Sequence, residues 1–79
     1  MEKKFVDVIC EMNQNGLVKP IYLIWEKNKR IPIIQIKEIK PKAQIEYGAS
    51  GLRYTCIFSP NIEKHLYFDR GKWYVELMV

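Results

Sequence analysis

Side chains that could support catalysis are few in this 79-residue chain. His65 is the only histidine. If Arg70-Gly71 forms the centre of a hairpin turn, His65 lies opposite Glu76, and a carboxylate beside an imidazole can tune a general base. An ordinary surface pair on neighbouring strands explains the same two residues, and no nucleophile is placed beside His65 by the sequence. We therefore expect no enzyme activity and name no catalytic residue.

The two cysteines, Cys10 and Cys56, lie in strand-like runs, and the chain has no CxxC motif and no Cys/His cluster. No secretion signal is evident, so we expect free, buried thiols in a cytoplasmic protein and no structural zinc site. The glycines of Gly48-Ala49-Ser50-Gly51 precede neither a helix nor a Lys-Ser/Thr pair, so they do not predict a phosphate loop. We expect no metal, cofactor or small-molecule substrate.

Basic residues are concentrated in the central third of the chain. Residues 19–42 hold seven Lys and Arg against two Glu, a net +5, whereas the rest of the chain sums to −1. A basic groove with stacking aromatic rings is how small barrels bind single-stranded nucleic acid. The candidate nucleic-acid contacts are Lys27, Lys29, Arg30, Lys37, Lys40 and Lys42. A solvated rim that protects strand edges is the alternative, and the excess of Lys over Arg favours it.

Short antiparallel strands must position all of these side chains. The clearest evidence is the run 64–77, in which two apolar-rich segments flank Arg70-Gly71. Opposite charges then meet beside the turn and aromatic rings meet behind it, which stabilises an antiparallel pair. The expected pairs are Asp69 with Lys72, Phe68 with Trp73, Tyr67 with Tyr74 and Leu66 with Val75. In this register Trp73 faces the core, and Tyr67 and Tyr74 face outward.

Other runs with alternating or continuous apolar residues predict strands at 5–12, 21–25, 30–39, 43–47 and 52–58. Proline has no N–H to donate, so it belongs at a strand start, an edge or a bulge. We place Pro20 at the start of the strand 21–25 and expect Pro32 at an edge or a bulge. Strands about ten residues apart with turn residues between them are typical of a sandwich or barrel. We therefore expect residues 1–79 to form one domain, an all-β small antiparallel barrel of five to seven short strands, SH3-like or OB-like.

A core can be chosen from the positions that alternate inward on these strands. The expected core consists of Val6, Val8, Cys10, Leu23, Trp25, Ile33, Leu52, Tyr54, Cys56, Phe58, Leu66, Phe68, Trp73, Val75 and Leu77. In 21–25 and 31–36, however, both faces are apolar, with Ile34 and Ile36 opposite Ile31 and Ile33. A half-wet strand should alternate with polar residues. Either another segment covers the outer face, or a partner does, most simply a second copy.

Several short motifs carry a resemblance to a known family. They are Pro20, Ile24-Trp25-Glu26, Arg30, Pro32-Ile33, Gly51-Leu52-Arg53-Tyr54-Thr55 and the run from Leu66 to Val75. From Gly16 onward the chain resembles a family of uncharacterised small β-rich proteins of low-GC Gram-positive bacteria. Asn28 stands where many relatives have glycine, and both residues tolerate a positive φ. The resemblance implies a fold and no activity.

The favoured function is a non-catalytic module that binds a protein partner or assembles with a second copy of itself. Its candidate protein-contact surface is Tyr22, Ile24, Ile34, Tyr67 and Tyr74. The alternative is a weak, sequence-tolerant nucleic-acid-binding barrel. Uncharged stretches such as 20–25 are far too short to span a bilayer, so we expect no membrane partner.

Overall fold

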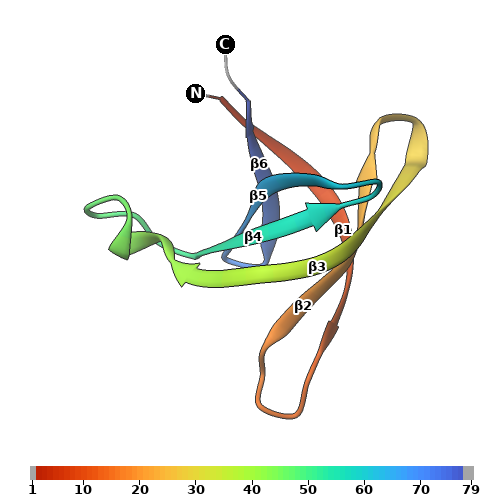
Figure 1. Cartoon of the computed structure of the whole chain (residues 1–79). Helices are drawn as coiled ribbons and strands as arrows, with labels where there is room; N and C mark the ends of the chain where they lie inside the picture. The colour runs from red at the N-terminus through yellow and green to blue at the C-terminus, as the bar shows by residue number, and fades with distance from the viewer. Residues whose placement is uncertain (1, 78–79) are drawn as a thin grey trace.

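Six antiparallel strands close into a small β-barrel in a computed structural model, which describes residues 2–77 (Figure 1). Each strand pairs with its neighbours in sequence, and β6 pairs with β1. The elements are β1 (Glu2–Met12), β2 (Val18–Trp25), η1 (Glu26–Asn28), β3 (Lys29–Pro41), η2 (Lys42–Gln44), β4 (Leu52–Phe58), β5 (Ile62–Asp69) and β6 (Lys72–Leu77). The all-β barrel prediction is confirmed. The sequential strand order differs from the Greek-key order of an OB-fold.

The β5–β6 hairpin has the predicted register close to its turn. Its ladder pairs are Tyr67 with Tyr74, Phe68 with Trp73 and Asp69 with Lys72. Both turn residues have positive φ, Arg70 at 54° and Gly71 at 78°, as a two-residue type I′ turn requires. The ladder then stops, and the predicted pair of Leu66 with Val75 is not part of it. β5 continues beside β4, whereas β6 turns away to run beside β1 (Figure 1).

Two β-bulges bend β3, which pairs with two different strands along its length. Its first part pairs with β2 at residues 29–32, and its second part pairs with β4 at residues 33–41. The register shifts leave Ile34 and Lys37 as the extra residues. Because each bulge inserts one residue, it resets which side chains face inward. Ile36 therefore packs against the core, and the prediction that it shares the outer face with Ile34 is wrong.

A third irregularity explains why one predicted core residue lies outside. Ile9 pairs with Tyr22 and Cys10 with Pro20, so Ile21 has no partner in this ladder. Pro20 is thus fully buried inside β2 beside the bulge, not at the strand start. Beyond this point β1 and β2 extend past the core as a projecting hairpin (Figure 1). Cys10 is exposed for that reason, and its assignment to the core is wrong.

The core follows the alternation of β4 and the last hairpin. Its buried members are Leu23, Tyr54, Cys56, Phe58, Leu66 and Trp73. Tyr54 lies with its ring centre 5.2 Å from that of Trp73, and its hydroxyl donates a hydrogen bond to the Val18 carbonyl. Burying each large apolar side chain contributes roughly 1.5–3 kcal/mol. Leu77, also expected in the core, is 37% exposed at the end of β6.

The segment between β3 and β4 is not the strand predicted at 43–47. It contains the short η2 turn and a loop, in which the N–H groups of Ile45 and Glu46 donate to the Lys42 carbonyl. The Lys42 N–H donates to the Gly51 carbonyl at 2.9 Å and closes the loop. No helix within residues 2–77 is long and apolar enough to cross a membrane.

Candidate functional site

A groove of ≈ 910 Å³ lies where β5 and β6 separate, and we call it the β5–β6 groove. Its walls come from β5 residues 62–65, β6 residues 75–77 and β3 residues 29–32. Its apolar lining includes Leu23, Trp25, Ile31, Phe58 and Val75. Figure 1 shows the cause, because β6 leaves β5 at a steep angle just beyond the turn.

Strand edges without a ladder partner border this groove. The pair that flanks a two-residue turn is hydrogen-bonded, and hydrogen-bonded pairs alternate with non-hydrogen-bonded ones. Asp69–Lys72 and Tyr67–Tyr74 are therefore hydrogen-bonded pairs. Alternate residues of a strand direct their main-chain N–H and C=O groups to the same side. Glu63 and His65 therefore direct theirs toward β6, as Tyr67 does. Because the described ladder ends at Tyr67, these groups face the groove and have no ladder partner on β6 within residues 2–77.

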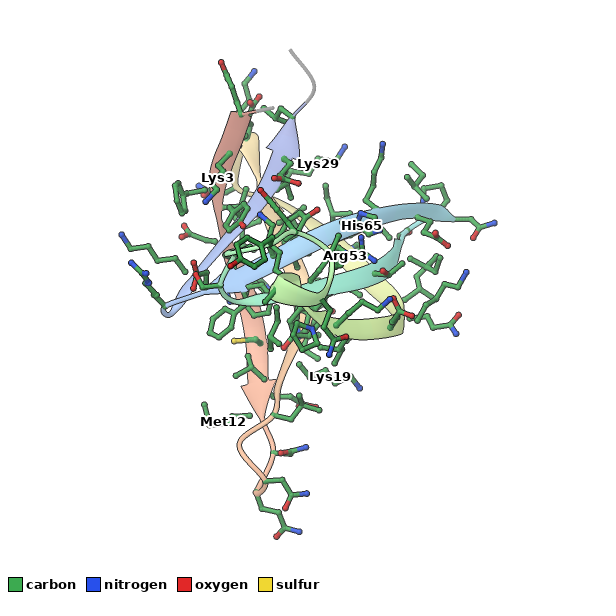
Figure 2. All side chains as sticks on the ribbon, turned by 90° about the vertical axis from the view of Figure 1, so that its left-hand side faces the viewer. Lys3, Met12, Lys19, Lys29, Arg53 and His65 are labelled. Atoms are coloured by element: carbon green, nitrogen blue, oxygen red, sulfur yellow. The ribbon has the colours of Figure 1, made fainter. Side chains whose placement is uncertain are left out.

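Unbalanced positive charge surrounds the groove. Lys29, Arg30 and Lys64 line it and make no ion pair within residues 2–77. Its two carboxylates, by contrast, are each close to a lysine from outside. Glu63 accepts a hydrogen bond from Lys37 at 2.8 Å, and Glu76 lies 3.5 Å from Lys42 Nζ. Figure 2 shows Lys29 and His65 in the upper half of the barrel, whereas Met12 and Lys19 lie toward the far hairpin.

His65 lies on the groove wall without an acid–base partner of the kind the sequence suggested. The predicted ladder pair with Glu76 is not formed. Partial burial lowers the pKa of His65, and the nearby positive charge of Arg53 lowers it further. The negative charges of Glu63 and Glu76 act to raise this pKa but are outweighed. The imidazole is therefore neutral at physiological pH and offers one N–H donor and one acceptor.

Residues of the candidate protein-contact surface are divided between two places. Tyr22 and Ile24 lie half-buried on β2, and Ile34 is 58% exposed on β3. Tyr67 and Tyr74 are buried instead, with their rings stacked at 5.0 Å. The expectation that these two tyrosines are exposed is wrong, because the loop after β3 covers them through Lys42.

Candidate nucleic-acid contacts are also separated by the fold. Lys27, Lys29 and Arg30 lie at the tip of the β2–β3 hairpin. Lys37 pairs with Glu63 at 2.8 Å, and Lys40 lies 3.9 Å from Glu38. Lys42 is only 7% exposed and cannot meet an outside partner without rearrangement, so its assignment as a surface contact is wrong. The fold instead places Lys64, which sequence reasoning did not single out, on the same groove as Lys29 and Arg30.

Lys42 has a structural environment of its own. Its ammonium group donates to the Tyr74 hydroxyl at 2.8 Å and lies 3.7 Å from Glu46. Burial acts to lower the pKa of Lys42, but the hydrogen bond from this lysine to Tyr74 and the charges of Glu76 and Glu46 outweigh it and raise the pKa. Burial and a hydrogen bond with Glu76 raise the pKa of the neighbouring Tyr67 to about 12. This cluster holds a loop in place.

A smaller cavity of ≈ 410 Å³ lies at the other end of the barrel, lined in part by Met12, Leu17 and Lys19. Within residues 2–77, no group of three or more His, Cys, Asp or Glu side chains is placed to hold a metal ion. When the chain is compared with protein-family models, curated proteins and solved structures, nothing matches.

Proposed function

We propose that this chain is a non-catalytic module that holds an extended segment of a partner protein in the β5–β6 groove. The observation that carries the proposal is the early end of the β5–β6 ladder, which leaves main-chain groups of β5 without a β6 partner in the described part of the chain, beside an apolar floor. Unpaired strand edges bind extended peptides by adding them to the sheet, and pockets beside the edge select their side chains.

The dimensions of the groove support an extended occupant. The free part of β5 covers residues 62–66, which at about 3.3 Å per residue is roughly 16 Å of strand edge. Trp25 and Phe58 line the floor and provide apolar area, while Lys29 and Arg30 provide charge at one side. An interface usually combines such an apolar centre with a polar rim.

Nucleic-acid binding and self-assembly are the competing functions. Binding of single strands needs a continuous basic track, and the acidic partners of Lys37 and Lys40 interrupt it. Assembly of two copies would use the surface of Tyr22, Ile24 and Ile34, but Tyr22 and Ile24 are half-buried and only Ile34 is exposed. Neither competitor uses the apolar floor as directly as a peptide does.

Two further expectations also belong among our proposals. One is the relationship to the small β-rich proteins of low-GC Gram-positive bacteria, supported by the motifs in 51–55 and 66–75. The other is a cytoplasmic location without a membrane partner, supported by the free cysteines.

The test is selection of random peptides displayed on phage against the whole chain. The groove variant is Ile62→Ser combined with Leu77→Ser, because both side chains line the groove and are partly exposed, so the barrel should survive. The matched control is Ile34→Ser, an exposed isoleucine outside the groove. We expect enriched peptides to bind the groove variant about tenfold more weakly than the unaltered chain and the control equally well.

Failure to enrich any peptide, or equal affinity for the groove variant, would overturn the proposal. Salt-sensitive binding of single-stranded oligo(dT) that is lost in Lys27→Ala, Lys29→Ala and Arg30→Ala would assign the chain to nucleic acid instead. A stable dimer in light scattering that is broken by Ile24→Lys, with the fold retained, would assign it to self-assembly.

A further inference from the structure

We infer that the bound segment adds to β5 as a strand and carries carboxylate side chains that meet Lys29, Arg30 and Lys64. The inference rests on the proposed function, since it specifies how the groove recognises its occupant. It makes two separate claims, one about main-chain pairing and one about charge.

The main-chain claim follows from the parity of the hairpin. Glu63 and His65 each direct one N–H and one C=O toward the space that β6 has left. Lys64 and Leu66 direct theirs toward β4, where they have ladder partners. An added strand would satisfy the groups of Glu63 and His65 without disturbing any existing pair. No register shift interrupts β5, so this parity holds along the whole edge.

The charge claim follows from the ion pairs around the groove. Lys37 and Lys42 already offset the charges of Glu63 and Glu76. Lys29, Arg30 and Lys64 have no acidic partner within the described part of the chain, and they line the groove from β3 and β5. An occupant with carboxylates would balance them and associate faster at low salt, because complementary charge steers encounter. A lysine-rich segment would be repelled.

Two observations favour a peptide over a nucleic-acid strand as the anionic occupant. The unpaired groups of Glu63 and His65 form the alternating donor and acceptor pattern of a sheet edge, which another main chain matches along its length. The floor beneath them is apolar, with Leu23 and Val75 beside Trp25 and Phe58. Alternate side chains of an added strand would point into this floor and out to solvent.

The first measurement needs no ligand. In the free chain, hydrogen exchange followed by NMR should be fast at the amides of Glu63 and His65 and slower at those of Lys64 and Leu66, whose N–H groups pair with β4. Equal protection at all four amides would overturn the main-chain claim. Peptide display would then decide the proposed function separately, because binding through the apolar lining of the groove does not require main-chain pairing.

The second measurement uses capped hexapeptides of alternating valine and glutamate, with a valine–lysine counterpart and an N-methylated valine–glutamate version as probes. We expect the valine–glutamate peptide to shift the amides of Glu63, His65 and Glu76 and to protect the first two from exchange. The lysine counterpart and the N-methylated version should bind at least about fivefold more weakly. Equal binding of all three probes, no shift at these amides, or stronger shifts with an oligo(dT) probe would overturn the inference.

A pair of proline variants separates pairing from fold. His65→Pro removes an N–H that faces the groove, a position where an edge strand tolerates proline. Lys64→Pro removes an N–H that pairs with β4 and should unfold the hairpin. We expect His65→Pro to keep the barrel, by circular dichroism, and to lose valine–glutamate binding. Unchanged binding in a folded His65→Pro variant would contradict strand addition.

Discussion

Lys42 Nζ donates a hydrogen bond of 2.8 Å to the Tyr74 hydroxyl and so joins the loop after β3 to β6. The same ammonium group lies 3.5 Å from Glu76 and 4.7 Å from the centre of the Tyr67 ring. It therefore holds the loop over the outer face of the β5–β6 hairpin close to its turn, where the two tyrosine rings stack. Lys42 is one of the lysines that make the central third of the chain basic, but its role in the structure is to stabilise the fold.

Replacement of this lysine by methionine should destabilise the barrel. Lys42→Met keeps an apolar stem but leaves the Tyr74 hydroxyl without its hydrogen-bond donor and removes the ammonium charge beside Glu76. Loss of one partner of a buried polar group costs about 2 kcal/mol. Lys40→Met is the control, because its pair with Glu38 is long and its side chain is exposed, so we expect a change below about 0.5 kcal/mol. Urea unfolding of the two variants checks this, and equal midpoints would refute the role of Lys42.

Gly51 should tolerate no side chain. It has a φ of +88°, and a Cβ at this position would lie 2.5 Å from the Phe68 carbonyl oxygen. Gly51→Ala therefore adds a backbone clash to left-handed strain, and we expect a loss on the order of 3 kcal/mol. Gly48 has a similar φ of +79° but open space around it, so Gly48→Ala should cost only about 1 kcal/mol. Thermal unfolding measures the difference, and equal losses would show that the close approach of Gly51 to β5 is relieved at no cost.

The two thiols should react at very different rates. Cys10 is exposed on the projecting hairpin, whereas Cys56 is fully buried between neighbouring strands, and burial raises the pKa of its thiol to about 11. Only the thiolate is nucleophilic. A disulfide reagent should therefore modify one thiol per chain quickly under native conditions and the second only after denaturation. The folded variants Cys10→Ser and Cys56→Ser each retain one thiol. If the Cys56 thiol of Cys10→Ser reacted as fast as the Cys10 thiol of Cys56→Ser, the buried position of Cys56 would be contradicted.

The free energy of unfolding should fall as the pH rises above about 9. Burial raises the pKa of Cys56 from 9.0 to about 11. Below about pH 9 the thiol is neutral in both states, but above it the unfolded chain loses the proton first, so ionisation favours unfolding. The buried thiol contributes a loss on the order of 2 kcal/mol by about pH 11. Tyr67 adds to this decline above about pH 10, because its pKa is also raised.

Urea midpoints measured from about pH 8 to about pH 10.5 test this decline. The slope with pH should be shallower in Cys56→Ala, which lacks the thiol, and unchanged in Cys10→Ser, whose thiol is exposed. An identical slope in all three proteins would refute the contribution of Cys56.

The last hairpin could be predicted from sequence because its signals are local. Turn chemistry at Arg70-Gly71 and the facing of Phe68 with Trp73 depend on residues within a few positions of each other. The bulges could not be predicted in the same way. The side on which Ile36 lies depends on how β3 divides its length between β2 and β4, which are distant in sequence.

The candidate site shows the same division. Lys29 and Arg30 were singled out by charge, but Lys64 joins them only because β5 crosses near the β2–β3 tip. No local pattern in the sequence predicts that β6 pairs with β1. The β5–β6 ladder ends where β6 turns away to run beside β1. The sequence therefore contains no pattern that predicts the groove, although it predicts each strand that borders the groove.

The sequence by itself determined that this chain forms short antiparallel strands with a mainly aromatic and aliphatic core, because alternation and turn residues act over a few positions. The tertiary structure decided which edges remain open, which lysines keep a free charge and which tyrosines are covered. Those outcomes depend on closing a ring of six strands, in which bulges and the pairing of the first strand with the last set the directions of all the others.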